Sequence, residues 1–297
     1  MFFISEVSKN EKNKRACAKW FIFLFVLEIG IAIFERLTNS LLFSYALFNP
    51  EDDNVLVNGI EYFRSNSLLG HPLSNALCVA VVLAFVAVSD LKKYLKYLLI
   101  LAGFVALLCF NARFAIIISF SFYSLYYLAK NKLKPGSLIA LASAVLVIFF
   151  LIVNFNLGDR LLIGNLKADD TSILARVDIL DMLQRLNSDL LFRGSGLDFV
   201  EKSFGILHIE NWLLIIIFDL GILVSIYYVY MIFKLPLRSL IRYDFYDKAY
   251  IFAVFIIIAS SNNSLATGVP VISFMIASSM FLPLNSQKET SYGVSHF

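Results

Sequence analysis

The chain has 297 residues, of which 59% are hydrophobic and only 16% are charged. Soluble domains carry about 25% charged residues, so this composition argues against an ordinary water-soluble domain and favours a membrane protein. The formal net charge of +3 is small, and it indicates no nucleic-acid partner.

Eight apolar stretches approach or reach the ~17–25 residues that a membrane-spanning helix requires. They cover residues 19–35, 71–89, 94–110, 113–129, 137–157, 210–233, 247–262 and 268–284. Their apolar residues are continuous rather than alternating, which favours helices over barrel strands. The sequence therefore predicts an all-α protein, a polytopic transmembrane helix bundle of about eight spans that forms a single membrane domain over residues 1–297.

The segments between the predicted spans indicate the orientation of the chain. Basic residues fill the N-terminal segment and the connections after the second, fourth and sixth spans, which read "SDLKKYLKY", "KNKLKPG" and "KLPLRSLIRYDFYDK". All four segments lie on one side of the membrane if the spans alternate. The opposite segment, 36–70, holds four acids against two arginines. By the positive-inside rule, both termini are expected in the cytoplasm.

The sequence "LLCFNARFAIII" places Arg113 between the third and fourth predicted spans. One helix from Tyr97 to Ala129 would be ~50 Å long at 1.5 Å per residue, whereas the hydrocarbon core is about 30 Å thick. The chain is therefore expected to turn at Asn111-Ala112-Arg113, the polar point of this run, and the turn is expected to face the outside.

The segment 158–209 is the long connection between the fifth and sixth predicted spans, and it is expected to form a large outer loop. Within it, apolar residues recur at helical spacing and predict a helix over 172–186. The glycine-rich "FRGSGLDF" that follows predicts a break or turn.

Arginines gather on the predicted outer side, and two of them suit an anionic ligand. Arg113 lies in the turn and Arg176 in the predicted loop helix. The planar guanidinium group donates paired hydrogen bonds to phosphate. The alternative is that these arginines pair with nearby acids such as Asp178 or Asp181. The acids and cysteines show no metal-binding spacing, so no metal site is expected.

Further polar residues lie at or within the predicted spans. His208 and Glu210, in "HIENWLL", could act as a base on a substrate hydroxyl, or they could form an interfacial polar cluster. His71, in "LLGHPLSN", could cap a helix or line the outer mouth of the bundle. Glu28 and Asp219 lie within spans, where ionisable groups carry function or form hydrogen bonds between helices.

Taken in chain order, the motifs form a series. "LLGHPLSNA" opens one span, "NAR" follows two spans later, and "SILARVDILDML" and "RGSGLDF" precede "IENWLLIIIFDLG". Over roughly residues 68–223, this series resembles the O-antigen polymerase (Wzy) and O-antigen ligase superfamily, and it is closest to capsule or O-antigen repeat-unit polymerases. The residues that match the family pattern are Arg113, Arg176, Gly194, Gly196, Glu210, Asn211, Asp219 and Gly221.

The resemblance implies a membrane glycosyltransferase of the bacterial inner membrane, with 158–209 as a periplasmic loop. It would polymerise undecaprenyl-pyrophosphate-linked oligosaccharide repeat units at the outer leaflet, without a cofactor. The implied partners are this lipid-linked glycan and membrane lipid, with a flippase and a chain-length regulator as candidates. The implied catalytic residues are Arg113, Arg176, Glu210 and His208, and the implied substrate-binding residues are His71, Arg193, Gly194, Gly196 and Asn211.

Two other functions stay open at this stage. A ligase of the same superfamily would transfer finished glycan to lipid A core. A transporter or flippase of polysaccharide intermediates would use Arg113, Glu28 and Asp219 as charges along its pathway.

Overall fold

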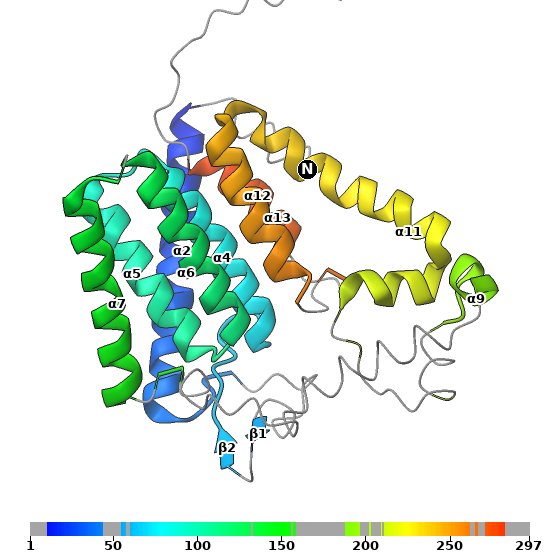
Figure 1. The fold of residues 1–297 in the computed structure, drawn as a ribbon, viewed down its shortest axis with the longest axis horizontal. Helices are drawn as coiled ribbons and strands as arrows, with labels where there is room; N and C mark the ends of the chain where they lie inside the picture. Colours follow the sequence, from blue (N-terminus) through cyan, green and yellow to red (C-terminus); the bar gives the residue numbers. More distant parts are fainter. Residues whose placement is uncertain are drawn as a thin grey trace, which may run out of the picture.

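A bundle of α-helices makes up most of the described part of the chain (Figure 1). The computed structural model describes residues 11–43, 55–57, 60–131, 133–155, 157–158, 188–196, 202, 209, 211–261, 265–266 and 271–282. The helices are α2 (Glu11–Thr38), α4 (Pro72–Val88), α5 (Lys93–Cys109), α6 (Arg113–Lys130), α7 (Pro135–Phe155), α9 (Ser188–Arg193), α11 (Trp212–Ser239), α12 (Phe245–Ala259) and α13 (Val271–Phe281), with a 3₁₀ turn at Leu240–Arg242. Two short strands, β1 (Val55–Val57) and β2 (Ile60–Tyr62), pair antiparallel with Val55 opposite Tyr62.

Each of the eight predicted apolar stretches overlaps a helix of this bundle. Among the described residues, three helical segments are long and apolar enough to cross a membrane: Arg15–Thr38, Pro135–Phe155 and Trp212–Arg238. Helices α4 and α13 are apolar but shorter, with 17 and 11 residues. That all eight helices span the membrane stays a prediction. The predicted loop helix over 172–186 lies outside the described residues.

Helix α4 is the centre of the bundle. Fifteen of its 17 residues are buried, and it packs against α5, α6, α12 and α13. Its sequence, PLSNALCVAVVLAFVAV, has small or apolar side chains on every face. A helix that is apolar all round is stable only where neighbouring helices or lipid cover every face, so α4 fits the interior position.

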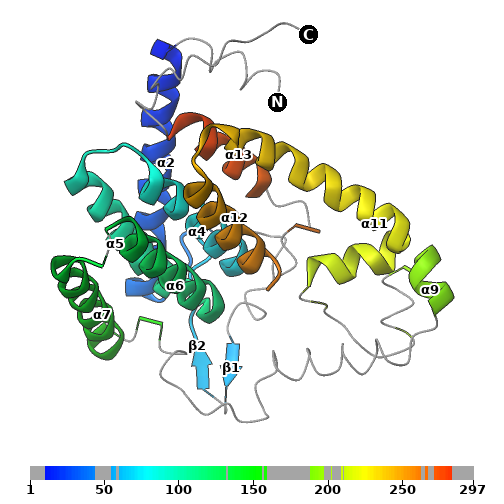
Figure 2. The ribbon, with the colours of Figure 1, turned by 45° about the horizontal axis from the view of Figure 1, so that its top comes forward.

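Helix α7 lies at the edge of the bundle and contacts α6 (Figures 1 and 2). Among its described side chains only Ser137 and Ile152 are buried, while large apolar side chains such as Ile139, Leu146 and Phe150 are 67%, 67% and 57% exposed. Soluble monomers rarely expose so large a continuous apolar surface. The exposed face of α7 therefore indicates an apolar surrounding, as a lipid bilayer provides.

Consecutive helices of the bundle alternate in direction, so their connections fall at two opposite ends (Figure 1). One end, at the top of Figure 1, holds the start of α2 and the α4–α5, α6–α7 and α11–α12 connections. We call it the basic end, because lysines and arginines fill these segments. The other end holds the β1–β2 hairpin and the α5–α6 turn, and we call it the turn end.

At the basic end, a polar cluster ties α6 to α12. The Lys130 ammonium group lies 2.9 Å from Asp247 Oδ1 and 3.4 Å from Asp244 Oδ2. The Tyr126 hydroxyl donates a hydrogen bond to Asp247 Oδ1 at 2.7 Å, and its ring stacks on Tyr250 with the centroids 4.5 Å apart. Burial alone would lower the pKa of Lys130, but the hydrogen bond to Asp247 and the two carboxylate charges raise it.

Candidate functional site

The predicted turn around Arg113 is present at the turn end of the bundle. Helix α5 ends at Cys109 and α6 begins at Arg113, so three residues reverse the chain. Asn111 has a φ of +54°, a left-handed conformation that asparagine tolerates better than most residues. The Arg113 side chain is half-buried on the first turn of α6.

A non-helical segment, Phe63–Gly70, packs against this turn, and we call it the buried loop. The Arg64 Nε donates a hydrogen bond to the Phe110 carbonyl at 3.3 Å, and the Ser65 N–H donates to the Cys109 carbonyl at 3.2 Å. The side chains of Arg64, Ser65, Asn66 and Ser67 are all buried. The sequence places Arg64 in an outer connecting segment, but in the structure its side chain is buried at the end of the bundle.

Two buried carboxylates of α2 hold the backbone of the buried loop. Glu35 is fully buried and accepts hydrogen bonds from the N–H groups of Leu42 at 3.0 Å and of Asn66 and Ser67 at 2.9 Å. Glu28 accepts from the Leu68 N–H at 3.2 Å. Buried N–H groups are costly without a partner, so these acids allow a non-helical segment to lie within the bundle.

The carboxylates share the turn end with guanidinium groups, and we call Glu28, Glu35, Arg36 and Arg64 the charged cluster. Arg36 is 8% exposed and donates to the Phe63 carbonyl, while Arg64 is 9% exposed. Buried charges are tolerated when they are paired and hydrogen-bonded. With Arg113 on the adjoining turn, the turn end holds three arginines and two glutamates, whose formal charges sum to +1.

The first turn of α4 holds the buried loop from the other side. Asn75 accepts a hydrogen bond from the Leu69 N–H at 3.2 Å and donates one to the Asn66 carbonyl. His71 is the N-cap residue of α4, and its half-buried side chain makes no capping hydrogen bond. His71 thus occupies the capping position, as one of the two alternatives predicted, but without a capping hydrogen bond from its side chain, and it lies at the end of the buried loop.

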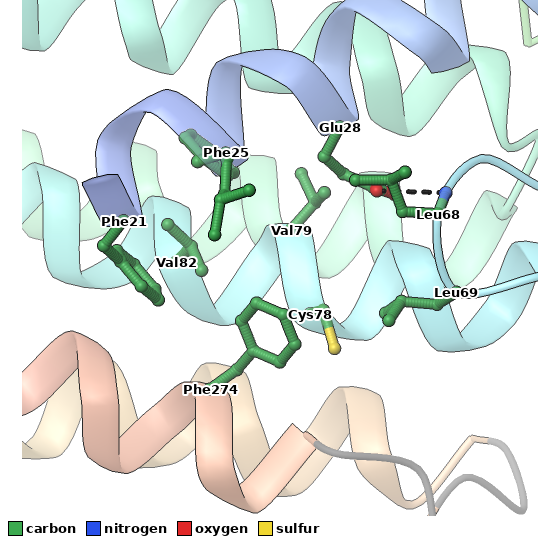
Figure 3. A pocket seen from close by; sticks show the side chains of 10 residues that line it. Phe21, Phe25, Glu28, Leu68, Leu69, Cys78, Val79, Val82 and Phe274 are labelled. Atoms are coloured by element: carbon green, nitrogen blue, oxygen red, sulfur yellow. Dashed lines mark hydrogen bonds between the residues drawn. The ribbon is translucent and has the colours of Figure 1, made fainter. Parts of the chain in front are cut away.

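An apolar cavity of about 110 Å³ extends from the buried loop into the bundle between α2, α4 and α13 (Figure 3). Leu68 and Leu69 of the loop line it, together with Phe21, Leu24, Phe25, Glu28, Cys78, Val79, Val82 and Phe274. Glu28 is its one charged lining residue among those described, and its Oε1 has no hydrogen-bond partner. The cavity therefore joins an apolar slot to the charged cluster.

A second group of predicted residues meets at the kink of α11. Gly221 has a φ of +77° and a ψ of 164°, which interrupts the helix. The Phe218 carbonyl just before the kink accepts hydrogen bonds from the N–H groups of Ser195 at 2.7 Å and of Gly196 at 3.0 Å. The predicted G-x-G turn therefore docks on the predicted acid-x-Gly segment.

Glycine is required on both sides of this contact. A Cβ added to Gly221 would lie 2.3 Å from the Phe192 carbonyl oxygen, and one added to Gly194 would lie 2.8 Å from the Asp219 carbonyl oxygen. Gly194 and Gly196 also have φ values of +77° and +76°. The structure thus gives Gly194 and Gly221 a packing role, whatever they bind.

Asn211 begins α11 and fixes its position. Its Oδ1 accepts hydrogen bonds from the N–H groups of Leu213 at 2.9 Å and Leu214 at 3.2 Å, and its Nδ2 donates to the Ser260 carbonyl at 3.2 Å. The side chain therefore caps α11 and joins it to the end of α12. Asn211 was expected to bind substrate. The contacts seen here are structural, and they do not test that binding role.

Apart from Asn211, which lies at the start of α11 beside the Ser260 carbonyl, the predicted site residues in the described part of the chain fall into two groups. His71 and Arg113 lie at the turn end with the charged cluster. Arg193, Gly194 and Gly196 lie at α9, which both views place on the far side of the molecule from α6 (Figures 1 and 2). Arg176, His208 and Glu210 lie outside the described residues.

Sequence reasoning missed Glu35, Arg36 and Arg64 as members of the site. One signal was present, because Glu28, Ala32 and Glu35 are spaced i, i+4 and i+7 and share one helix face. Ala32 lies on the same face and accepts a hydrogen bond from the Ser65 hydroxyl at 2.8 Å. Two acids at this spacing inside an apolar helix predict a polar partner segment.

Comparison of the chain with protein-family models, with curated proteins and with solved structures finds no match.

Proposed function

We propose that this chain is a membrane glycosyltransferase that polymerises undecaprenyl-pyrophosphate-linked repeat units, as the resemblance to O-antigen and capsule polymerases implies. One observation carries the proposal: Arg36, Arg64 and Arg113 gather at the turn end, away from the lysine- and arginine-rich connections of the basic end. Arginines in an apolar bundle are costly, so their concentration there favours an anionic ligand.

The membrane orientation follows from the same asymmetry. The basic end faces the cytoplasm under the positive-inside rule, and the turn end then faces the outer side. Consecutive helices of the bundle, α9 aside, alternate in direction, as this topology requires (Figure 1). The apolar exposed face of α7 supports contact with lipid. In this orientation both termini lie in the cytoplasm and the site lies at the outer leaflet of the bacterial inner membrane.

The proposed reaction transfers a glycan between lipid carriers. A hydroxyl of one repeat unit attacks the anomeric carbon of the growing glycan, the bond from that carbon to the pyrophosphate oxygen breaks, and the lipid pyrophosphate leaves. The hydroxyl proton passes to Glu210 or His208, as the family pattern implies. Arg113 and Arg176 stabilise the negative charge that develops on the leaving group.

The turn end provides the two environments that a lipid-linked donor needs. Arg113 is half-buried, and a charge–charge attraction is stronger in a partly desolvated site than in water. The apolar cavity beside the buried loop offers space for part of the lipid chain (Figure 3). This pairing of guanidinium groups with an apolar slot supports a substrate that joins pyrophosphate to a lipid.

The transporter alternative is less well supported by the described residues. A transport pathway would need a continuous polar route through the bundle, whereas the cavity at Glu28 is otherwise apolar. Glu28 and Glu35 accept hydrogen bonds from the backbone of the buried loop. Asp219 is exposed on α11. The ligase alternative uses the same chemistry and differs in its acceptor, so only the products distinguish it.

Polymer length in cells tests the proposal. Arg113→Lys keeps the charge but loses the paired donor geometry, so we expect a rate about 100-fold lower, as for a lost transition-state donor. Arg176→Lys should act in the same way. The matched control is Arg238→Lys, an exposed arginine at the basic end, which should keep normal polymer.

The identity of the accumulated product separates the two enzymes. Lost polymerisation leaves single repeat units on lipid A core or on the lipid carrier, whereas lost ligation leaves long unattached chains. Normal polymer length in both arginine variants, with each protein present in the membrane, would contradict the role proposed for these residues.

A further inference from the structure

The first three turns of α2 carry basic side chains on one face, away from the turn end. Lys12, Arg15 and Lys19 are exposed and spaced i, i+3 and i+7, so they form a stripe along the helix. We call these three residues the basic stripe. Among the described side chains of α2, the first acid after the stripe is Glu28.

Two aromatic residues continue the same face towards the centre of the bundle. Trp20 and Phe23 are 66% and 54% exposed, and their rings meet edge to face with centroids 5.7 Å apart. The opposite face of α2 is the packed one, where Ala18 and Phe25 are 0% and 6% exposed. The aromatic pair therefore points away from the bundle.

The stripe and the aromatic pair line one open groove. Its described lining residues are Lys12, Arg15, Ala16, Lys19, Trp20 and Phe23. Lys12 and Phe23 are eleven residues apart, which is about 16 Å along a helix at 1.5 Å per residue. That length reaches from a phosphate in the headgroup layer to the upper part of an acyl chain.

We propose that this groove binds an anionic phospholipid of the cytoplasmic leaflet. The lipid phosphate lies among the three basic side chains, and its acyl chain covers Trp20 and Phe23. Basic clusters immediately beside a membrane helix attract anionic lipid, and tryptophan favours the interface between headgroups and chains. A zwitterionic lipid would bring its quaternary amine near three cations, and a soluble anion would leave both rings uncovered.

Quenching of tryptophan fluorescence by brominated lipid tests this site directly. The chain has two tryptophans, and Trp212 is 4% exposed with its ring packed on Phe233 at 6.1 Å. In a Trp212→Phe background the emission reports on Trp20 alone. The full chain is placed in phosphatidylcholine vesicles that contain increasing fractions of either brominated phosphatidylglycerol or brominated phosphatidylcholine.

Brominated phosphatidylglycerol should quench Trp20 at a mole fraction several-fold lower than brominated phosphatidylcholine. Because the three basic side chains supply the attraction to the anionic lipid, the triple substitution Lys12→Gln, Arg15→Gln and Lys19→Gln should remove the preference. High salt should reduce it in the parent protein. Millimolar inorganic phosphate should leave it unchanged, since the site is proposed for lipid.

The matched control removes three lysines from other connections of the basic end, by Lys92→Gln, Lys93→Gln and Lys134→Gln. It changes the net charge equally and should keep the preference for phosphatidylglycerol at Trp20. Equal quenching by the two lipids would overturn the proposal. Persistence of the preference in the α2 triple variant, its loss in the control, or its removal by inorganic phosphate would also overturn it.

Discussion

Replacing Glu35 by alanine removes the acceptor of three backbone hydrogen bonds at once, and this makes it the sharpest test of how the buried loop is held. The three donors are the N–H groups of Leu42, Asn66 and Ser67. A buried N–H group that loses its partner costs about 1–3 kcal/mol. The loop can relieve part of this cost by opening to water, so we expect Glu35→Ala to destabilise the loop by about 3 kcal/mol.

Two further variants make this estimate specific. In Glu35→Gln the amide oxygen can still accept from Asn66 and Ser67, which share Oε2, and only the part-buried bond from Leu42 is lost. The expected cost is therefore about 1 kcal/mol. Glu28→Gln keeps its single acceptor for Leu68 and should cost less than that.

Hydrogen exchange of the peptide that covers Phe63–Gly70, measured by mass spectrometry in detergent, reports the opening of the loop. A loss of about 3 kcal/mol corresponds to exchange faster by about 100-fold, since 1.4 kcal/mol is a factor of ten. The order of protection should be wild type, Glu28→Gln, Glu35→Gln and then Glu35→Ala. Unchanged exchange in Glu35→Ala would refute the reasoning, because the buried N–H groups of Asn66 and Ser67 would then need no acceptor.

Three other predictions use different parts of the structure. Gly221→Ala should destabilise the docking of α9 on α11 by more than about 2 kcal/mol, since it combines a positive φ with a backbone clash. Gly196→Ala should cost about 1 kcal/mol, because its Cβ would meet open space, and limited proteolysis should distinguish the two variants. Reporter fusions at Arg238 should indicate cytoplasm and those at Glu51 the outer side, and a cytoplasmic signal at Glu51 would reject the orientation. Asp247→Asn removes a charge that both a lysine and a tyrosine of α6 contact, so it should lower the thermal unfolding midpoint in detergent, and an unchanged midpoint would show that this contact contributes nothing measurable.

The helices and the turn at Arg113 could be predicted because simple lengths decide them. A continuous helix through this arginine would be too long for a bilayer, so the chain had to reverse at its polar residues. The exact form of the turn was less accessible, since no glycine or proline marks it. In the structure, Asn111 adopts a left-handed backbone conformation at this turn, which the sequence alone did not indicate.

The contacts between distant segments were beyond sequence reasoning. Arg36 and Arg64 are counted as charges of a connecting segment, because no local pattern shows that the buried loop folds back against α2 and the α5–α6 turn. The two glycine motifs around Gly194 and Gly221 are each visible in the sequence, but their contact depends on the kink in α11. Local spacing predicts an element, whereas tertiary packing decides which backbone groups need partners.

The charged cluster explains how a guanidinium-rich turn can exist at the end of an apolar bundle. Glu35 and Glu28 accept hydrogen bonds from backbone N–H groups of the buried loop. Arg36 and Arg64 in turn donate to the carbonyls of Phe63 and Phe110. The cluster therefore satisfies the polar backbone of the loop and turn with charges of both signs. Under the proposed function, these contacts from α2 and α4 would hold the turn that carries the half-buried Arg113 before a ligand binds, as electrostatic stabilisation of a leaving group requires.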